Sequence, residues 1–185
     1  MADATVRPAE PSDAAEITRI QLDTWRAAYA DLLPAEILAG LDAEEAELTW
    51  RQTIEQGPAQ VLVAVEGDWI VGFCAAGLAP EDETAGADGS PAKDSATVAL
   101  VSTVLVEPRW GRRGHGGRLL ARAGEAMRAA GSTRGIAWVP EPDKATLGFY
   151  DRASWVADGT VRTLDAGGRP LREVRLTGTL RIELV

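Results

Sequence analysis

The amino-acid sequence predicts a single domain, residues 1–185, of mixed α/β class, in which one β-sheet carries helices on both faces. Its length of 185 residues suits one domain that buries roughly two-thirds of the unfolded chain's surface. The apolar fraction of 45% and the charged fraction of 25% are ordinary for a globular protein. Helical and strand patterns follow the order β-α-α-β-β-β-α-β-α-β-β, which favours a mixed sheet between layers of helices.

The first half of the chain is expected to supply a strand, two helices and a hairpin. Asp13 and Glu16 have the spacing of a capping box and mark the start of the first helix. Trp25 and Tyr29 lie one turn apart on that helix. The apolar spacing predicts a strand at 5–8, a helix that starts at 11–13 and ends before 32–34, a helix at 43–56, and hairpin strands at 61–65 and 69–75.

The second half begins with a segment of different composition. Residues 80–96 are rich in small residues and proline, with five acids against one lysine, and we expect a mobile acidic loop. Asp143 can cap a later helix, and Gly131 ends an earlier one. The patterns predict a central strand at 98–106, a helix at 118–130, a strand at 136–139, a helix at 144–152, and strands at 155–164 and 172–180.

Composition also limits the classes of partner. The net charge of −9 disfavours nucleic acid and anionic membranes as partners. Cys74 is the only cysteine, so no internal disulfide can form, and a buried thiol is expected. No run approaches the roughly 20 apolar residues of a membrane span, and no signal peptide precedes Pro8. We therefore expect a cytoplasmic monomer or homodimer.

The most informative stretch is the glycine-rich turn at 111–117, which we call the phosphate turn. It joins the β-prone run at 98–106 to a helix, an arrangement that aims backbone N–H groups at one anion. Between Arg109 and Arg134 there are seven arginines and one acid, Glu125, so this window carries +6 and the remaining residues sum to −15. The consecutive amides of Arg113 to Gly117 suit a diphosphate, with charge added by Arg112 and Arg113.

Two other phosphate motifs fit the turn poorly. A P-loop requires Gly-Lys-Ser/Thr, but Arg118 and Leu119 follow Gly117. A dinucleotide fingerprint requires a third glycine where Leu119 stands, and an acid about 20 residues later that the region lacks. A glycine-rich turn beside a solvated basic helix face is the alternative without a ligand.

The string V-x-P-x-W-x-R-R-G-x-G-G-R-L-L resembles the acetyl-CoA-binding motif of the GNAT superfamily of N-acetyltransferases. The positions that match are Val106, Pro108, Gly114, Gly116, Leu119 and Leu120. Gly111 stands in the family's Gln/Arg place, and Arg112 stands where the family has its first glycine. Downstream, 149–155 is similar to the family's F-Y-x-x-x-G-F element, with Ser154 and Trp155 in place of Gly and Phe. The resemblance implies a GNAT-like, largely antiparallel sheet of about seven strands flanked by about four helices.

The resemblance also implies a cosubstrate, acetyl-CoA, and the residues that hold it. The backbone of Val104, Leu105 and Val106 would pair with the pantetheine arm like an added strand. The diphosphate would lie on the phosphate turn, and Asp143 stands where the family often has Asn. The implied cofactor-binding residues are Val104, Leu105, Val106, Arg112, Arg113, Gly114, His115, Gly116, Gly117 and Asp143.

The implied reaction transfers an acetyl group from the thioester to a primary amine of a small molecule or a protein by direct attack. His115 is the only histidine and Cys74 has no partner at ligand spacing, so neither a metal site nor a nucleophile triad is indicated. Family resemblance places Tyr150 beside the sulfur as the general acid, while a tyrosine packed in the core is the other interpretation. His115 is expected to be a spectator in the turn.

The general base and the acceptor site are less determined. The strand positions that carry a glutamate in some relatives are Leu100, Val101 and Ser102, which do not titrate. The candidates to replace that glutamate as the base are Glu141, Glu81, Asp82 and a chain of water molecules. The sequence does not distinguish between them. Trp25 and Tyr29 are candidates to line the acceptor pocket, with core packing as the alternative. Two alternatives would contain the phosphate turn without catalysing acetyl transfer. One is a non-catalytic acyl-CoA-binding or sensing domain, and the other is a nucleotide-binding module of another kind.

Overall fold

A computed structural model describes residues 4–183 and shows one seven-stranded sheet in the order β1-β2-β3-β4-β5-β7-β6. Neighbouring strands are antiparallel except β4 and β5, which are parallel. The predicted mixed, largely antiparallel sheet of seven strands is therefore confirmed. The strands are β1 (Ala4–Pro8), β2 (Gln60–Glu66), β3 (Trp69–Leu78), β4 (Val98–Val106), β5 (Arg134–Pro140), β6 (Val156–Asp165) and β7 (Pro170–Gly178).

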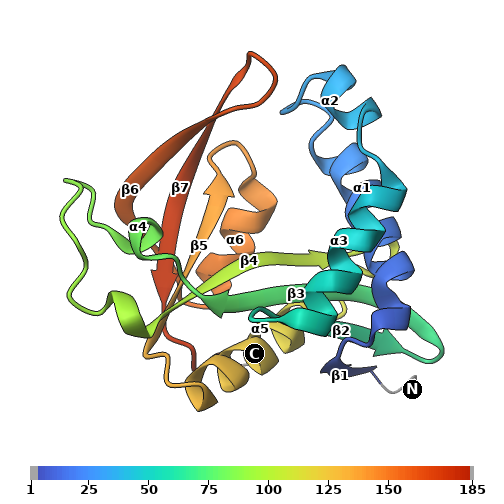
Figure 1. Ribbon diagram of the computed structural model, residues 1–185, viewed down its shortest axis with the longest axis horizontal. Coiled ribbons are helices and arrows are strands. Elements are labelled where there is room, and N and C mark those ends of the chain that lie inside the picture. Colours follow the sequence, from blue (N-terminus) through green and yellow to red (C-terminus); the bar gives the residue numbers. More distant parts are fainter. Residues whose placement is uncertain (1–3, 184–185) are drawn as a thin grey trace.

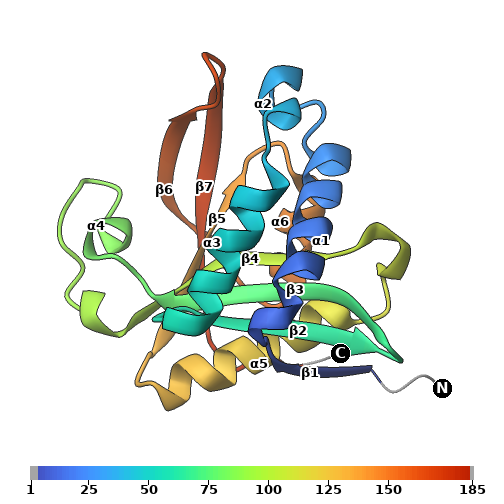
Figure 2. The same ribbon diagram turned by 45° about the vertical axis from the view of Figure 1, so that its right-hand side comes forward.

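Four helices of nine or more residues flank the sheet, as expected, and two shorter ones lie between them. Figures 1 and 2 show α1 and α3 over one face of the sheet and α5 over the other. The helices are α1 (Ala14–Ala28), α2 (Ala35–Ala39), α3 (Ala43–Gln56), α4 (Glu81–Thr84), α5 (His115–Ala129) and α6 (Lys144–Arg152). Short 3-10 turns are η1 (Pro11–Asp13), η2 (Ser95–Thr97) and η3 (Pro108–Trp110). Within residues 4–183 no helix is both long and apolar enough to cross a membrane.

Strand alternation separates two cores. Val61 and Val63 of β2 pack with Ile17 and Ile20 of α1 on one face. The intervening Leu62 and Ala64 pack with α5 on the other face, in the larger cluster. This period of two follows from the pleat of a strand, which points successive side chains to opposite faces. Both faces of the central strands are thus buried, and a site can open only at an end or a gap of the sheet.

Such a gap lies between β4 and β5. The two strands pair only over Val98–Leu100 and Arg134–Ile136. Beyond Leu100, β5 continues its ladder with β7 as far as Pro140, while β4 follows β3 as far as Val106. The register of β4 shifts at Ser102, since Ala75 pairs with Thr103 but Ala76 pairs with Val101. The carboxyl half of β4 therefore has a backbone edge that β5 does not cover.

Two local details differ from the sequence-based expectations. The capping box forms between Glu10 and Asp13, at the start of η1, and not between Asp13 and Glu16. The helix α2 was not anticipated, because five residues carry too little periodicity to detect. It is placed by a distant contact: at Gly167, in the β6–β7 turn, a Cβ atom would lie only 2.8 Å from Ile37 Cδ1.

Residues 80–96 contain α4 and η2, and side chains of the sheet hold them. The buried Arg175 of β7 donates from Nη1 to the carbonyl oxygens of Glu83 and Ala85, both at 2.7 Å. The Trp138 indole N–H donates to Glu83 at 2.8 Å, and Arg134 donates to Asp94 at 2.6 Å. The mobility of this acidic segment stays a prediction.

Candidate functional site

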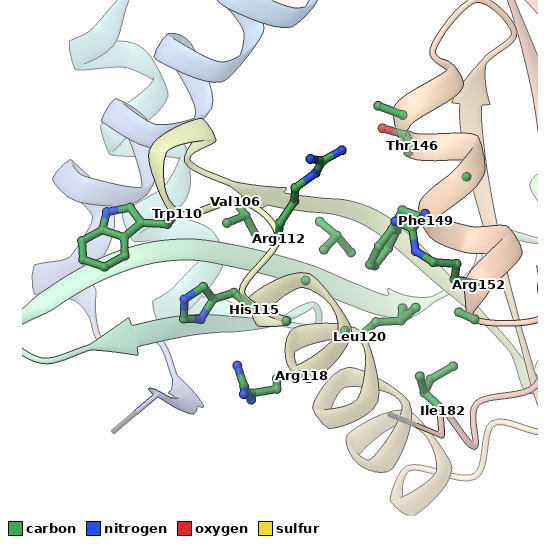
Figure 3. A pocket seen from close by; sticks show the side chains of 18 of the residues that line it. Val106, Trp110, Arg112, His115, Arg118, Leu120, Thr146, Phe149, Arg152 and Ile182 are labelled. Carbon is green, nitrogen blue, oxygen red and sulfur yellow. The ribbon is translucent and has the colours of Figure 1, made fainter. Parts of the chain in front are cut away.

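A pocket of about 870 Å³ opens beside the gap between β4 and β5. Figure 3 shows it bounded by β4, the phosphate turn, the start of α5, and α6. Strand and turn contribute Val104, Val106, Trp110, Gly111, Arg112 and Gly114. The two helices contribute His115, Gly116, Gly117, Arg118, Leu120, Lys144, Ala145, Thr146, Gly148, Phe149, Arg152 and Ala153, and the C-terminal segment adds Ile182 and Glu183. Seven of the ten predicted cofactor-binding residues thus meet at one surface.

The helix α5 begins at this pocket with free backbone N–H groups. Gly114 is its N-cap in the left-handed conformation, with φ at 81°. The first backbone bond of the helix runs from the Arg118 N–H to the Gly114 carbonyl at 3.0 Å. The N–H groups of His115, Gly116 and Gly117 precede that bond and have no acceptor within the helix. Together with the helix dipole they favour an anion at this point.

A close contact between helices explains the glycine at position 116. A Cβ atom at Gly116 would lie 3.1 Å from Phe149 Cε2, tighter than ordinary van der Waals contact. Glycine therefore lets the first turn of α5 approach α6 closely. Both Gly116 and Phe149 line the pocket.

Arg112, where the resembled motif has glycine, adopts the conformation that glycine favours. Its φ is 62°, in the left-handed region that L residues seldom occupy. Its side chain is exposed and extends from the turn toward α6, whereas the His115 ring points the opposite way (Figure 3). The backbone of the turn thus keeps the shape of a glycine-containing turn while Arg112 adds a positive charge at the pocket.

Three predicted cofactor-binding residues do not line the pocket. Arg113 Nη1 donates to Glu66 Oε1 at 2.9 Å, and its guanidinium lies 4.9 Å from the ring centroid of Trp110. Leu105 packs into the core on the α1 side of the sheet. Asp143 caps α6, accepting from the Thr146 N–H at 3.0 Å and from its hydroxyl at 2.7 Å.

Tyr150 lies in the core and is not among the residues that line the pocket, although its neighbour Phe149 is. It is 3% exposed, and its ring packs on those of Phe149 and Trp155, with both centroids 5.1 Å away. Burial raises the pKa of its phenol well above the usual range, and the nearby Cys74 and Tyr29 raise it further. Burial likewise raises the pKa of the Cys74 thiol to about 12. At neutral pH both groups are therefore protonated, and Tyr150 can donate a hydrogen bond.

The predicted acceptor residues Trp25 and Tyr29 lie together near the end of α1. Both are half-buried, and their ring centroids are 6.2 Å apart. Burial, with the charges of Asp143 and Glu173, raises the pKa of Tyr29 to about 12. Two carboxylates therefore act on this phenol, from α6 and from β7. The core-packing and acceptor-lining interpretations both accommodate this half-buried position.

Sequence reasoning did not anticipate Glu173, which lies far along the chain from Tyr29. Glu173 is 8% exposed and accepts from Arg162 Nε at 2.6 Å. The guanidinium of Arg162 lies 4.3 Å from the ring centroid of Trp138. The pocket residues Phe149 and Arg152 were also missed, although their spacing of three on a predicted helix was a usable signal.

The candidate bases stay separate from the pocket. Ser102, a non-titrating position where some relatives carry a glutamate, lies at the register shift of β4 and donates to the Ala75 carbonyl at 3.0 Å. Glu141 is exposed and pairs with Arg172 at 3.3 Å, while Glu81 and Asp82 are exposed on α4. Neither Ser102 nor any of these three candidate acids is among the residues that line the pocket. Among residues 4–183 no group of three or more His, Cys, Asp or Glu residues is arranged to hold a metal ion.

Comparison with known proteins identifies the class. The model of the acetyltransferase (GNAT) family matches residues 16–155. The uncharacterized N-acetyltransferase YuaI of Bacillus subtilis (strain 168) is 30% identical over 151 residues, which are 81% of this chain and 79% of that protein. The chain therefore belongs to the GNAT family of acetyltransferases, and it is an acyltransferase enzyme.

Solved structures share the fold at lower identity. An N-acetyltransferase from Staphylococcus aureus Mu50 superposes with a TM-score of 0.74 at 16% identity, covering 97% of this chain and 99% of that chain. YncA, a putative acetyltransferase from Salmonella typhimurium solved with its cofactor acetyl-CoA, gives 0.69 at 20% identity, covering 96% and 94%. The PaiA N-acetyltransferase from Thermoplasma acidophilum, solved with coenzyme A, gives 0.67 at 14%, covering 93% and 98%.

Proposed function

We propose that this acetyltransferase moves an acetyl group from acetyl-CoA to a primary amine of a small molecule or a protein by direct attack. The observation that carries the proposal is the pocket at the gap between β4 and β5. There the free N–H groups of His115, Gly116 and Gly117 border an uncovered strand edge. A long cofactor with a diphosphate at one end and amide groups along its arm matches both features.

The cofactor would lie along three parts of the pocket. The diphosphate would accept hydrogen bonds from the start of α5 and meet the charge of Arg112. The pantetheine amides would pair with the backbone of Val104–Val106, where β5 has separated from β4. This path brings the thioester toward the gap, and Tyr150 lies in the core beside it. A dry gap would also strengthen the polarisation of the thioester carbonyl by backbone N–H groups.

The chemistry balances with one proton lost and one gained. An alkylamine has a pKa near 10, so it must lose a proton before its nitrogen attacks the carbonyl carbon. The resulting C–N bond replaces the C–S bond, and CoA departs as a thiolate. Tyr150, which its raised pKa keeps protonated, would donate a proton or a hydrogen bond to that sulfur. We assign no residue as the base, since none of the candidate acids lines the pocket.

We place the amine acceptor on the side of Tyr29. Burial raises the pKa of this phenol most, and the charges of Asp143 and Glu173 raise it further, so negative potential reaches it from the start of α6 and from β7. Such a potential favours a cationic acceptor. Trp25, 6.2 Å from Tyr29 by ring centroids, would then contribute an aromatic surface. The net negative charge of the residues outside the arginine-rich window, 109–134, also favours a cationic acceptor.

A thiol-release assay with acetyl-CoA and a panel of amines tests the proposal. We expect CoA release above the hydrolysis rate for at least one cationic amine. Tight binding of acetyl-CoA without turnover on any amine would instead support the non-catalytic acyl-CoA-binding alternative. The cytoplasm stays the proposed location, because the chain has a single cysteine. A monomer or a homodimer stays the proposed oligomeric state.

A further inference from the structure

Glu66, at the end of β2, holds two residues of the phosphate turn. One carboxylate oxygen accepts from Arg113 Nη1 at 2.9 Å, and the other contacts His115 Nε2 at 2.6 Å. We propose that Glu66 is a positioning residue, which binds Arg113 and His115 and thereby fixes the phosphate turn in the shape that receives the cofactor's diphosphate. This inference rests on the proposed function, in which the turn is the diphosphate site.

The hydrogen bond between Glu66 and His115 is buried. The side chain of His115 is 1% exposed and that of Glu66 is 13% exposed, while the side chain of Arg113 is 53% exposed. His115 Nδ1 is buried and has no partner among the described residues. Within residues 4–183, the hydrogen bond to Glu66 is therefore the one polar interaction of this ring. A carboxylate requires a donor, so Nε2 carries the proton and donates it.

The two contacts lie on either side of the N-cap residue of α5. Gly114, with φ at 81°, separates Arg113 from His115. Arg118 Nη1 also donates to the Arg113 carbonyl at 2.9 Å, which ties the turn to the first turn of α5. A chain fixed on both sides of a flexible glycine cannot rotate its peptide planes freely. The N–H groups of His115 to Gly117 are thus held in direction before a ligand arrives.

Arginines outnumber acids around this contact, and one of them pairs with Glu66. Glu66 is the acid that faces the turn from β2, Arg113 and Arg118 face it from the turn and α5, and Arg109 lies with Arg113 over Trp110. Arg113 offsets the negative charge of Glu66 and is drawn away from the pocket. On the turn and the start of α5, the cations that line the pocket are then Arg112 and Arg118. A carboxylate near a diphosphate site is tolerated because a guanidinium neutralises it.

The sign of a charge change separates positioning from simple electrostatics. Glu66→Gln makes the region more positive, so electrostatics alone predicts tighter binding of an anionic ligand. Positioning predicts the reverse, because the amide binds His115 and Arg113 more weakly and the turn gains freedom. We expect the Kd for CoA to rise about tenfold, on the scale of ordering one or two side chains.

The test measures binding of CoA and of pantetheine, which lacks the diphosphate, to the whole protein by titration calorimetry. For Glu66→Gln we expect the Kd for CoA to rise while that for pantetheine changes less than about twofold. Asp68→Asn is the matched control, since it removes the same charge from the exposed turn of the same hairpin and leaves the contact intact. It should not weaken binding of either ligand.

His115→Leu provides a second, charge-neutral variant if Glu66→Gln fails to fold. It removes the hydrogen bond from a buried position that an apolar side chain of similar size can fill. The Kd for CoA should therefore rise, while the Kd for pantetheine stays nearly unchanged. The double variant should be no weaker than the worse single variant if the pair acts as one unit. Unchanged or tighter CoA binding in both single variants overturns the inference. An equal loss for pantetheine also overturns it, because the effect is then general.

Arg112→Ala separates this inference from the proposed function. If Arg112→Ala weakens CoA binding and Glu66→Gln does not, the turn binds the diphosphate and only the positioning role fails. If neither variant alters CoA binding, the placement of the diphosphate on this turn fails, and the positioning role fails with it.

Discussion

The rings of Tyr150 and Trp155 pack against each other, with their centroids 5.1 Å apart and their planes inclined by 35°. Trp155 is itself fixed: its indole N–H donates to the Thr179 carbonyl at 3.0 Å, and it is 2% exposed. At Gly135 a Cβ atom would meet the Trp155 ring at 2.5 Å, so strand β5 is in direct contact with it. Tyr150 therefore has a rigid support, which suits the role that we propose for it at the sulfur of CoA.

Tyr150→Phe should lower kcat by about 100-fold while leaving CoA affinity within about twofold, because the variant removes only the proton donor. Steady-state kinetics with calorimetric binding checks both quantities. Trp155→Phe is the control, because it loosens the packing against Tyr150 but keeps the tyrosine hydroxyl. It should lower the free energy of unfolding, while kcat falls much less than in Tyr150→Phe. An unaltered kcat for Tyr150→Phe would return this tyrosine to a purely structural role.

Ser154→Gly should stabilise the protein. Ser154 follows α6 with φ at 61°, and the helix end is closed by bonds from the Ser154 N–H to Asp151 and from the Trp155 N–H to Tyr150. This bonding pattern places a left-handed residue where glycine is favoured. We expect a gain of about 1 kcal/mol, or roughly 2–4 °C in Tm, by thermal denaturation. Ser154→Ala keeps the unfavourable φ and should show no gain, and a gain as large as that of glycine would contradict this explanation.

Arg112→Gly and Arg112→Ala form a matched pair at the other left-handed position, with φ at 62°. Both remove the same charge, so both should weaken CoA binding, and the loss should shrink at high salt. Only glycine relieves the backbone conformation, and Arg112→Gly should therefore be about 1 kcal/mol more stable than Arg112→Ala. Calorimetric binding at two salt concentrations and urea denaturation measure the two effects. Equal stabilities would show that φ at this residue carries no strain.

Asp13→Asn should destabilise the protein in a pH-dependent way. Burial acts to raise the pKa of Asp13, but hydrogen bonds from Arg7 and the Glu10 N–H, with the Arg7 charge, outweigh it and lower the pKa. A carboxyl whose pKa is lowered on folding stabilises the protein above its unfolded pKa, near 3.9, and loses that contribution as pH falls through the folded value.

At pH 7 we therefore expect a loss of about 2 kcal/mol in the free energy of unfolding for Asp13→Asn, the scale of hydrogen bonds to a charged group. The difference between wild type and variant should narrow as the pH falls below about 4. Urea denaturation at several pH values measures it. A difference that stays constant down to pH 3 would mean that the charge of Asp13 contributes nothing.

Elements governed by local pattern were predicted closely. Three elements have the predicted bounds: the helices at 43–56 and 144–152 and the strand at 98–106. Their signals are apolar periodicity, capping residues and helix-breaking residues, which all act over a few neighbouring positions. The start of α5 was placed late, at 118 in place of His115, since two glycines in its first turn lower the helical signal.

The sequence by itself determined the phosphate turn, its arginine-rich surroundings and the Phe149-Tyr150 element, because each is a run of neighbours whose chemistry is visible in order. Only the tertiary structure decided what these residues contact. Arg113, expected at the diphosphate, binds Glu66, 47 positions earlier, and Tyr29 meets the potential of Glu173, far along the chain. The separation of β4 from β5, which creates the pocket, is likewise visible in neither strand alone. Such contacts arise when distant segments pack to bury their apolar faces, so no local spacing in the chain encodes them.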